Sequence, residues 1–564
     1  MRRRAAGAAA AVLWILLGLR WFDAAAGGRP AWLEHVPPIA LAAGGLLAVA
    51  VAFRGRWRVR QGPALAGPRG GLLLVVGLAV LFRLPLAWHG AAGYVTADGA
   101  LSGIVALHVR DGTEHLVFVP HVPYSGSLKS HLTAPLAAVV DPARAFALVS
   151  VAFYAAFVAA LYRLALLAGG SGWSAMAAGL YAAFAPAFVT RYSLSNDGNY
   201  VEVLALGTWA LVMAARWARE EDDAHLLSLA VGLMIGLAFW CHILAVIHCA
   251  AIAVWALAAA PRRALRSAPT ALLGFVLGDW PGLLWNAANG WESFQYLRPG
   301  SVGGTAGTGP GLGARAWHLI ADQARVLLGY DPGYPAAFDL ALKALAVLAV
   351  TVAVVATVVA ARRAWRQRSA ELGLLVVFTI VNVVVALRAL PLIEGNPRYL
   401  QFLMAPLPIF MALLLDAPRR RWLMALLVAF GAAGSLAQVP GTVRSDDQWR
   451  RFVDDLEKEG VKWCETDFHL ATKINFLSQE RVICSSKLGP VTTEYFFEYR
   501  RQVDAAPEAA LVAVNPTAAE KLERRLERLA VGYERRDFMK PVLLRLSRKV
   551  EPEELFPGRE FPLR

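Results

Sequence analysis

Apolar residues gather in long runs along most of this chain, and short polar segments separate the runs. A helix needs about 20 mostly apolar residues to cross the hydrocarbon core of a bilayer, and many of the runs have about that length. The pattern therefore predicts a polytopic α-helical membrane protein with about thirteen spans. The run 226–260 could instead hold one span and a buried helix. The predicted spans are 8–26, 38–53, 71–90, 145–168, 174–190, 200–217, 226–241, 243–260, 270–287, 336–360, 371–390, 399–415 and 422–438.

The composition agrees with this class. Of the 564 residues, 57% are hydrophobic and only 17% are charged, and the mean hydropathy is +0.47. Soluble domains are typically about 45–50% apolar and about 25% charged, so a soluble enzyme is excluded. A net charge of +14 would suggest nucleic acid as the partner of a soluble protein. Here the arginines flank the spans, so the expected partner is the lipid bilayer and not nucleic acid.

Arginine clusters predict the orientation of the chain. Short loops rich in Arg and Lys face the cytoplasm, and with thirteen spans all five clusters fall on one side. The loops 91–144 and 288–335 and the C-terminal tail then face outward. We therefore expect a multi-pass membrane protein with an extracytoplasmic C-terminus. The clusters lie at 2–4, 54–69, 262–266, 362–368 and 419–421.

The tail has the pattern of a small α/β domain. Asp446 or Asp447 is placed to cap a first helix, and Asn515 is placed to cap a later one with Pro516 at its first position. Alternating helices and strands favour a mainly parallel sheet. Cys464 and Cys484 end two of the strands and are candidates for a disulfide, which an extracytoplasmic compartment permits. The domain could be a lid, an acceptor-binding module or a structural cap. The predicted strands are 461–464, 481–484, 510–514 and 542–546, and a further helix is predicted at 469–477.

The loop 91–144 carries the first candidate for chemistry. Asp98 stands just after a span, before an amphipathic segment that we expect at the membrane surface. A carboxylate in this position can act as the general base for a lipid-borne substrate. The alternative is that Asp98 only caps the helix that follows it.

Two further segments carry ionisable residues near the outer ends of spans. Glu202 lies just inside a span, where a charged group suggests a functional site and needs a partner. Arg191 or Arg398 could supply that partner, or Glu202 could belong to a structural ion pair. Arg398, followed by Tyr399, suits an anionic group such as phosphate. Its alternative role is an interfacial anchor.

Histidines 108, 115, 121 and 131 raise the question of a metal. Their spacing matches no compact ligand motif. We therefore expect no cofactor, although a divalent metal remains chemically possible.

Short motifs in these segments resemble the GT-C superfamily of membrane glycosyltransferases, which includes protein O-mannosyltransferases and aminoarabinose transferases. The resemblance is strongest to the glycosyltransferase family 39 branch, also called RgtA/B/C/D-like, and covers about residues 71–440. The motifs are Leu81-Phe-Arg83-Leu-Pro85 with Ala97-Asp98-Gly99-Ala100, Tyr124-Ser-Gly126-Ser-Leu-Lys129, Asp197-Gly198-Asn199-Tyr200-Val-Glu202, and Asn396-Pro-Arg398-Tyr399-Leu400. The branch often has Asp-Glu where this chain has Asp98-Gly99, and Glu where this chain has Lys129.

Together with the residue patterns, the resemblance predicts three parts: residues 1–70 as an extra N-terminal hairpin with a basic cytoplasmic loop, 71–440 as the transmembrane domain, and 441–564 as the extracytoplasmic α/β domain. Because the branch is bacterial, the expected location is the bacterial inner (plasma) membrane. It also implies an inverting glycosyltransferase that moves a sugar from a polyprenyl-phosphate donor to an extracytoplasmic acceptor, which could be glycan, lipid or protein. Asp98 would be the catalytic base and Arg398 would bind the phosphate. The other expected substrate-binding residues are Tyr399, Tyr124, Lys129, Tyr200, Glu202, Asp197 and His121.

A transporter or lipid-binding membrane protein without transferase activity is the alternative. Transporters often show internal repeats and place ionisable residues near the middle of the membrane. The chain shows no internal repeat, and its candidate residues lie at the outer rim. The sequence therefore favours the enzyme.

Overall fold

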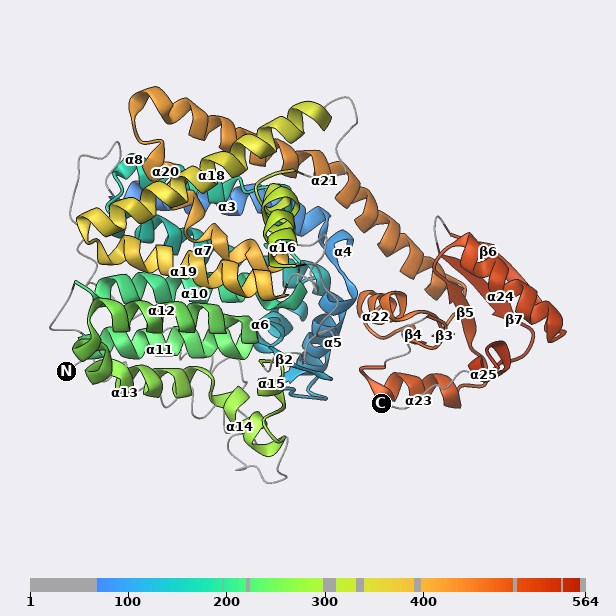
Figure 1. Cartoon of the computed structure of the whole chain (residues 1–564). Helices are drawn as coiled ribbons and strands as arrows, with labels where there is room; N and C mark the ends of the chain where they lie inside the picture. The colour runs from blue at the N-terminus through green and yellow to red at the C-terminus, as the bar shows by residue number, and fades with distance from the viewer. Residues whose placement is uncertain are drawn as a thin grey trace.

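The computed structural model describes residues 68–195, 197–219, 224–297, 311–330, 339–389, 397–489, 494–538 and 541–557. A bundle of long helices forms the larger part, and the tail forms an α/β domain beside one end of it (Figure 1). The predicted spans 8–26 and 38–53 lie outside the described residues.

Seven helices among the described residues are long and apolar enough to cross a membrane. The chain is therefore an integral membrane protein, as its hydropathy predicted. The helices are α3 (Pro68–His89), α7 (Pro142–Leu167), α10 (Tyr200–Trp217), α11 (Ala224–Cys241), α18 (Asp339–Gln367), α19 (Ala370–Ala389) and α21 (Arg421–Lys458).

Four other predicted spans form shorter or broken helices. Pro186 and Pro406 stand at two of the breaks, where the missing N–H ends a helix. Residues 174–190 become α8 (Gly172–Ala183) and α9 (Ala187–Tyr192), and 243–260 become η3 (Ile243–Ala245) and α12 (Val246–Ala259). Residues 270–287 cross the break between α13 (Pro261–Gly278) and α14 (Trp280–Ala288), and 399–415 become η7 (Arg398–Met404) and α20 (Leu407–Leu414).

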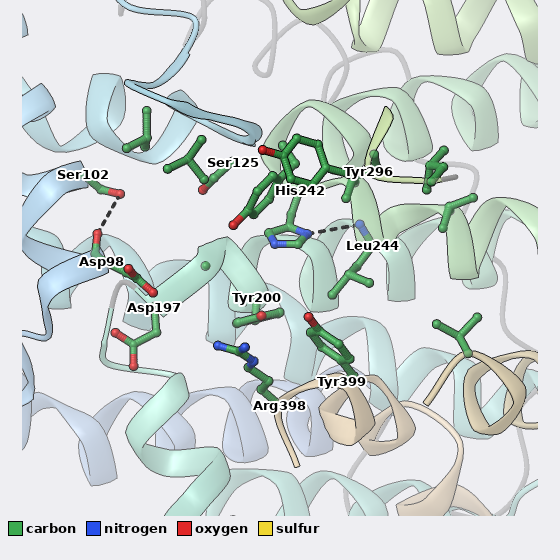
Figure 2. A pocket seen from close by; sticks show the side chains of 18 of the residues that line it. Asp98, Ser102, Ser125, Asp197, Tyr200, His242, Leu244, Tyr296, Arg398 and Tyr399 are labelled. Atoms are coloured by element: carbon green, nitrogen blue, oxygen red, sulfur yellow. Dashed lines mark hydrogen bonds between the residues drawn. The ribbon is translucent and has the colours of Figure 1, made fainter. Parts of the chain in front are cut away.

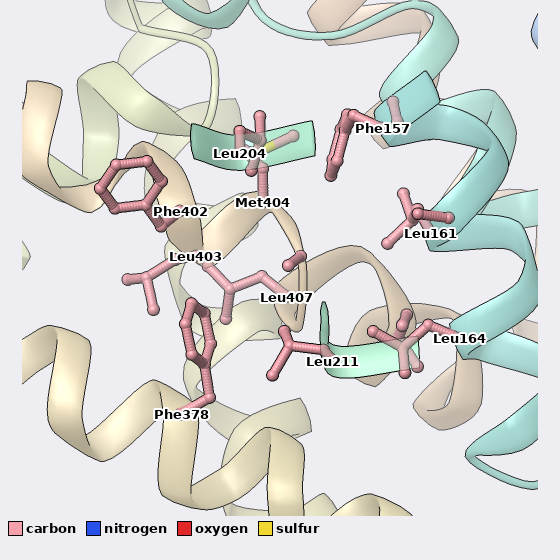
Figure 3. Packing of buried hydrophobic residues seen from close by; sticks show 14 of the residues in the cluster. Phe157, Leu161, Leu164, Leu204, Leu211, Phe378, Phe402, Leu403, Met404 and Leu407 are labelled. Atoms are coloured by element: carbon pink, nitrogen blue, oxygen red, sulfur yellow. The ribbon is translucent and has the colours of Figure 1, made fainter. Parts of the chain in front are cut away.

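The apolar run at 399–415 belongs to the core of the bundle. Residues 400–412 are all buried, and Figure 3 shows Phe402, Met404 and Leu407 among side chains of α7, α10 and α19. Apolarity alone does not distinguish a helix that faces lipid from one that faces protein, which is why this segment was predicted as a span.

Helices α11 and α13 approach each other unusually closely. Gly232 and Gly236 lie one turn apart on α11, and Gly274 and Gly278 lie one turn apart on α13. A Cβ added at any of the four would collide with backbone atoms of the opposite helix. Small residues at this spacing let membrane helices pack backbone to backbone, so the four glycines fix the contact between α11 and α13.

The loop 91–144 folds into α4 (Ala91–Tyr94), α5 (Ala97–Asp111), the strands β1 (Phe118–Val119) and β2 (Val122–Gly126), and α6 (Leu128–Ala137). We expected the amphipathic part of this loop at the membrane surface, and that was wrong. Leu101, Ile104 and Leu107 are buried, and the Phe476 ring of the tail packs directly on Gly103 of α5. The apolar face of α5 is covered by protein instead of lipid.

Helix α21 runs without a break from the bundle into the tail, over 38 residues. Asp446 therefore lies inside a helix and does not cap one, contrary to the prediction. Its carboxylate accepts hydrogen bonds from the Ala92 N–H at 2.6 Å and from Arg450 at 2.7 Å. Arg450 also donates to both carboxylate oxygens of Asp141, at 2.9 and 3.0 Å. These contacts join the tail helix to α4 and to the start of α7.

The tail contains a five-stranded sheet in the order β4-β3-β5-β7-β6. The predicted parallel pairing holds for β4, β3 and β5, whereas β7 and β6 pair antiparallel. β6 was not predicted, because four of its five residues are charged. The strands are β3 (Trp463–Glu465), β4 (Ile483–Ser485), β5 (Ala510–Ala513), β6 (Tyr533–Asp537) and β7 (Val542–Leu546), and the helices are α22 (Phe468–Leu477), α23 (Phe497–Ala505), α24 (Pro516–Arg528) and α25 (Pro552–Leu555).

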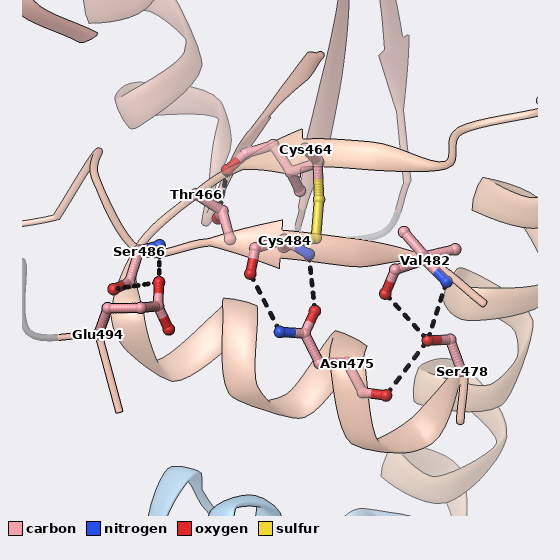
Figure 4. Close-up of a disulfide and its surroundings, with 9 residues drawn as sticks. Cys464, Thr466, Asn475, Ser478, Val482, Cys484, Ser486 and Glu494 are labelled. Atoms are coloured by element: carbon pink, nitrogen blue, oxygen red, sulfur yellow. Dashed lines mark hydrogen bonds between the residues drawn. A yellow bond between two sulfur atoms is a disulfide. The ribbon is translucent and has the colours of Figure 1, made fainter. Parts of the chain in front are cut away.

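Cys464 and Cys484 form a disulfide between the register partners of β3 and β4, with 4.4 Å between their Cα atoms (Figure 4). Asn475 of α22 holds the same point of the sheet, because its side chain donates to the Cys484 carbonyl and accepts from the Cys484 N–H. The Asn515 side chain accepts from the Ala518 N–H, as predicted for a cap.

Candidate functional site

Residues of the loop 91–144, the bundle and the tail line a cavity of about 950 Å³, which Figure 2 shows from close by. Six of the predicted site residues line it: Asp98, Tyr124, Asp197, Tyr200, Arg398 and Tyr399. The structure thus brings together residues that are up to 301 positions apart in the sequence.

Asp98 projects from the first turn of α5 and is exposed to the cavity. Thr96 caps this helix, because its hydroxyl accepts from the Gly99 N–H at 3.2 Å. The alternative that Asp98 serves as the cap is therefore wrong. The Asp98 carboxylate can therefore contact a ligand bound in the cavity.

Asp197 also lines the cavity and holds the start of α5. Thr96 donates its hydroxyl to one oxygen of the Asp197 carboxylate, and Arg191 lies 3.4 Å from the other. Because Thr96 also accepts from Gly99, Asp197 fixes the orientation of the capping hydroxyl.

Asn199 ties three segments of the cavity wall together. Its backbone is left-handed, with φ of 52°. The Asn199 side chain donates to the carbonyls of Gly126 and Cys241, at 2.6 and 3.0 Å. These bonds place Tyr200, Tyr124 and His242 on the cavity wall, because each stands within two residues of Asn199, Gly126 or Cys241.

Lys129 and Glu202 do not line the cavity, contrary to the prediction that they bind substrate. They form an ion pair, with 2.9 Å between Lys129 Nζ and Glu202 Oε1, and both side chains are almost fully buried. The partner of Glu202 is therefore Lys129 and not Arg191 or Arg398. The pair joins α6 to α10.

His121 does not line the cavity either. It is exposed in the turn between β1 and β2, and its ring contacts the rings of Tyr495 and Phe497 in the tail. His121 thus belongs to the interface between the tail and the loop 91–144.

Aromatic side chains form much of the polar wall. The ring centres of Tyr124 and Tyr296 are 4.5 Å apart. The ring centre of His242 lies 5.5 Å from that of Tyr124 and 5.2 Å from that of Tyr200. Burial raises the pKa of Tyr124 to about 12, and the nearby Asp98 carboxylate adds to the rise. Tyr124 therefore stays neutral and can donate a hydrogen bond at physiological pH.

Arg398 lies at the start of η7, with its guanidinium 5.5 Å from the centre of the Tyr399 ring. Figure 2 shows its side chain directed into the same space as Asp98 and Asp197. Val384, Val385 and Leu387 of α19 form an apolar wall of the same cavity. The cavity thus places a cation suited to phosphate beside a surface suited to a hydrocarbon chain.

The cavity also contains residues that the sequence did not indicate. His242, Tyr296, Arg315 and Tyr495 come from four separate segments, and none stands in a motif. No group of three or more His, Cys, Asp or Glu side chains suited to a metal occurs in the described part of the chain. His108, one of the four histidines considered for metal binding, pairs with Glu114 and Glu480 instead.

No protein-family model matches the sequence, and no curated protein matches it. The structure is similar to ArnT from Cupriavidus metallidurans. In the apo state ArnT aligns with a TM-score of 0.57 at 9% identity, over 84% of this chain and 98% of ArnT. ArnT bound to undecaprenyl phosphate aligns with a TM-score of 0.56 at 10% identity and the same coverage. AglB, an archaeal oligosaccharyltransferase from Archaeoglobus fulgidus, aligns with a TM-score of 0.49 at 11% identity, over 85% of this chain and 74% of AglB.

The similarity to ArnT extends over nearly the whole of that protein. The chain therefore has the fold of ArnT, in agreement with the membrane-transferase fold that its sequence motifs predicted.

Proposed function

We propose that this protein is a membrane glycosyltransferase that moves a sugar from a polyprenyl-phosphate carrier to an extracytoplasmic acceptor. One observation carries the proposal: a single cavity combines an exposed carboxylate, an arginine and an apolar wall, contributed by Asp98, Arg398 and α19. A soluble sugar donor would not require the apolar wall.

The donor fits the side of the cavity formed by α19 and η7. Its polyprenyl chain would lie against Val384, Val385 and Leu387, and its phosphate would meet the guanidinium of Arg398. Arginine suits phosphate because its planar fork can form two parallel hydrogen bonds. The similar structure of ArnT bound to undecaprenyl phosphate supports a lipid-phosphate ligand for this fold.

The reaction follows from the groups that face the cavity. Asp98 takes the proton of the acceptor hydroxyl, and the hydroxyl oxygen forms a bond to the anomeric carbon of the sugar. The bond between that carbon and the phosphate oxygen breaks, and its electron pair stays on the phosphate, where Arg398 stabilises the added charge. Attack opposite the leaving group inverts the configuration at the anomeric carbon.

We propose that the tail and the cavity lie outside the cytoplasm, in a bacterial inner membrane. The arginine-rich segments at 262–266, 362–368 and 419–421 support this orientation. They lie at the far end of the bundle from the tail (Figure 1). There Arg363 donates to the carbonyl of Leu413 at 3.3 Å. The disulfide of the tail also suits an oxidising compartment.

The test compares three bacterial strains: one with the gene, one with the gene deleted, and one in which Asp98→Asn replaces the native protein. Mass spectrometry of envelope glycans, lipids and proteins should reveal a species that carries one added sugar only in the first strain. Identical profiles in the first two strains would contradict the proposed function.

A further inference from the structure

Among the described residues of the tail domain, Tyr495 lines the cavity, and it stands two residues before the start of α23. Its ring packs against the rings of Phe468 and His121, with centre distances of 5.2 and 6.1 Å. Burial raises the pKa of Tyr495 above its usual value, and the carboxylate of Asp98 contributes to the rise. Tyr495 is therefore fixed at the cavity within electrostatic range of the proposed base.

A polar contact holds the tail to α5, the helix that carries Asp98. His108, near the end of α5, lies 2.9 Å from a carboxylate oxygen of Glu480, and Tyr499 donates its hydroxyl to the same oxygen. Arg110 donates to the Gln479 side chain at 2.8 Å. Because Tyr499 lies on α23, this contact fixes the element that follows Tyr495 relative to Asp98.

The residues that line the cavity differ in their chemistry. The donor side, as proposed above, consists of Arg398 and the apolar residues of α19. Asp98 and Ser102 from α5 also line the cavity, and so does Tyr495 from the tail. In Figure 2, Asp98 and Ser102 lie at the left of the view, and the Arg398 side chain points into the cavity from below. An acceptor hydroxyl must reach Asp98, and the charge of Asp98 acts on Tyr495. The acceptor therefore comes close to Tyr495.

We propose that Tyr495 binds the acceptor, so that the tail domain forms the acceptor-binding wall of the site. This inference rests on the proposed function. A tyrosine offers both an apolar ring face and a hydroxyl, and Tyr124 and Ser102 add further hydroxyl groups nearby. Ring faces and hydroxyl groups together suit the face of a sugar ring, so the acceptor is a carbohydrate or a lipid that presents one.

The experiment separates acceptor binding from donor binding. Tyr495→Ala and Tyr495→Phe are compared with Tyr533→Ala, a control in β6 of the same domain that does not line the cavity. Binding of undecaprenyl phosphate alone is measured on each purified full-length protein. Sugar transfer is measured as envelope product in strains that contain each variant, so the acceptor need not be known beforehand.

We expect Tyr495→Ala to reduce the envelope product about tenfold or more, because a lost aromatic and hydroxyl contact is worth about one factor of ten in binding. Undecaprenyl phosphate should bind all the Tyr495 variants as it binds the wild type, and Arg398→Gln should bind it more weakly. Tyr495→Phe should retain part of the product, since the ring remains.

Each other outcome has a definite meaning. Product from Tyr495→Ala equal to that from Tyr533→Ala would overturn the inference and leave the tail as a structural cap. Loss of undecaprenyl phosphate binding in Tyr495→Ala would place Tyr495 on the donor side and also overturn it. A sugar found only on protein would overturn the acceptor class. A wild-type strain without product would instead refute the proposed function itself.

Discussion

Replacement of Asp98 by Asn should abolish most sugar transfer while leaving the fold intact. Asn keeps the shape of the side chain but cannot accept the proton of the acceptor. Removal of a general base typically slows a reaction about 10²–10⁴-fold, which corresponds to about 3–5 kcal/mol in the barrier. Because Asp98 is an exposed acid that lines the cavity, we expect a loss of this size.

The effect of Asp98→Asn on stability should be much smaller. Thr96 caps α5 and Asp98 is exposed, so the substitution breaks no cap and empties no packed site. It removes one favourable charge at a helix N-terminus, which is worth about 0.3–1 kcal/mol at an exposed position. Asp98→Asn should therefore lose most of its transfer rate but little of its stability.

The assay uses both purified proteins with lipid extract and envelope from the deletion strain, which supply the donor and the acceptor together. Product is counted by mass spectrometry over time, and thermal unfolding is followed in parallel. Thr96→Ala serves as the matched control, because it removes the cap but keeps the carboxylate. Transfer by Asp98→Asn within a few-fold of wild type would refute the role of Asp98 as the base.

Three further predictions follow from the structure. Arg398→Lys should weaken binding of undecaprenyl phosphate, because an ammonium group cannot form two parallel bonds to phosphate; equal affinity in a direct binding assay would remove Arg398 from the donor site. Gly236→Ala should destabilise the purified protein by about 1–3 kcal/mol, because its Cβ would collide with the backbone of α13. The control is Gly77→Ala on α3, where an added Cβ meets no other atom and should not destabilise the protein. Equal thermal stability of the two variants would contradict the close packing of α11 and α13. Burial opposes protonation of His108, but hydrogen bonds to Glu114 and Glu480 raise its pKa to about 9. The stabilisation that protonated His108 gives the folded protein is therefore complete below about pH 6.5 and is lost as the pH rises through about 9. His108→Gln should flatten the dependence of thermal stability on pH, and an unchanged dependence would contradict the pairing.

The sequence alone determined the membrane class, because the length and apolarity of a spanning helix are local properties. It also indicated Asp98, Tyr200 and Arg398, since each stands in a short motif near the end of a predicted span, and all three line one cavity. Within the tail, the Asn515 cap was predictable because capping involves neighbouring residues only.

Only the tertiary structure decided which apolar runs are buried by protein and which partners the charged groups take. The 400–412 segment and α5 are covered by protein, and hydropathy is the same whether the neighbour is lipid or another helix. Glu202 pairs with Lys129, 73 residues away in the sequence, and Tyr495 reaches the cavity from the tail. Such contacts depend on how distant segments pack, and no local pattern of residues records that packing.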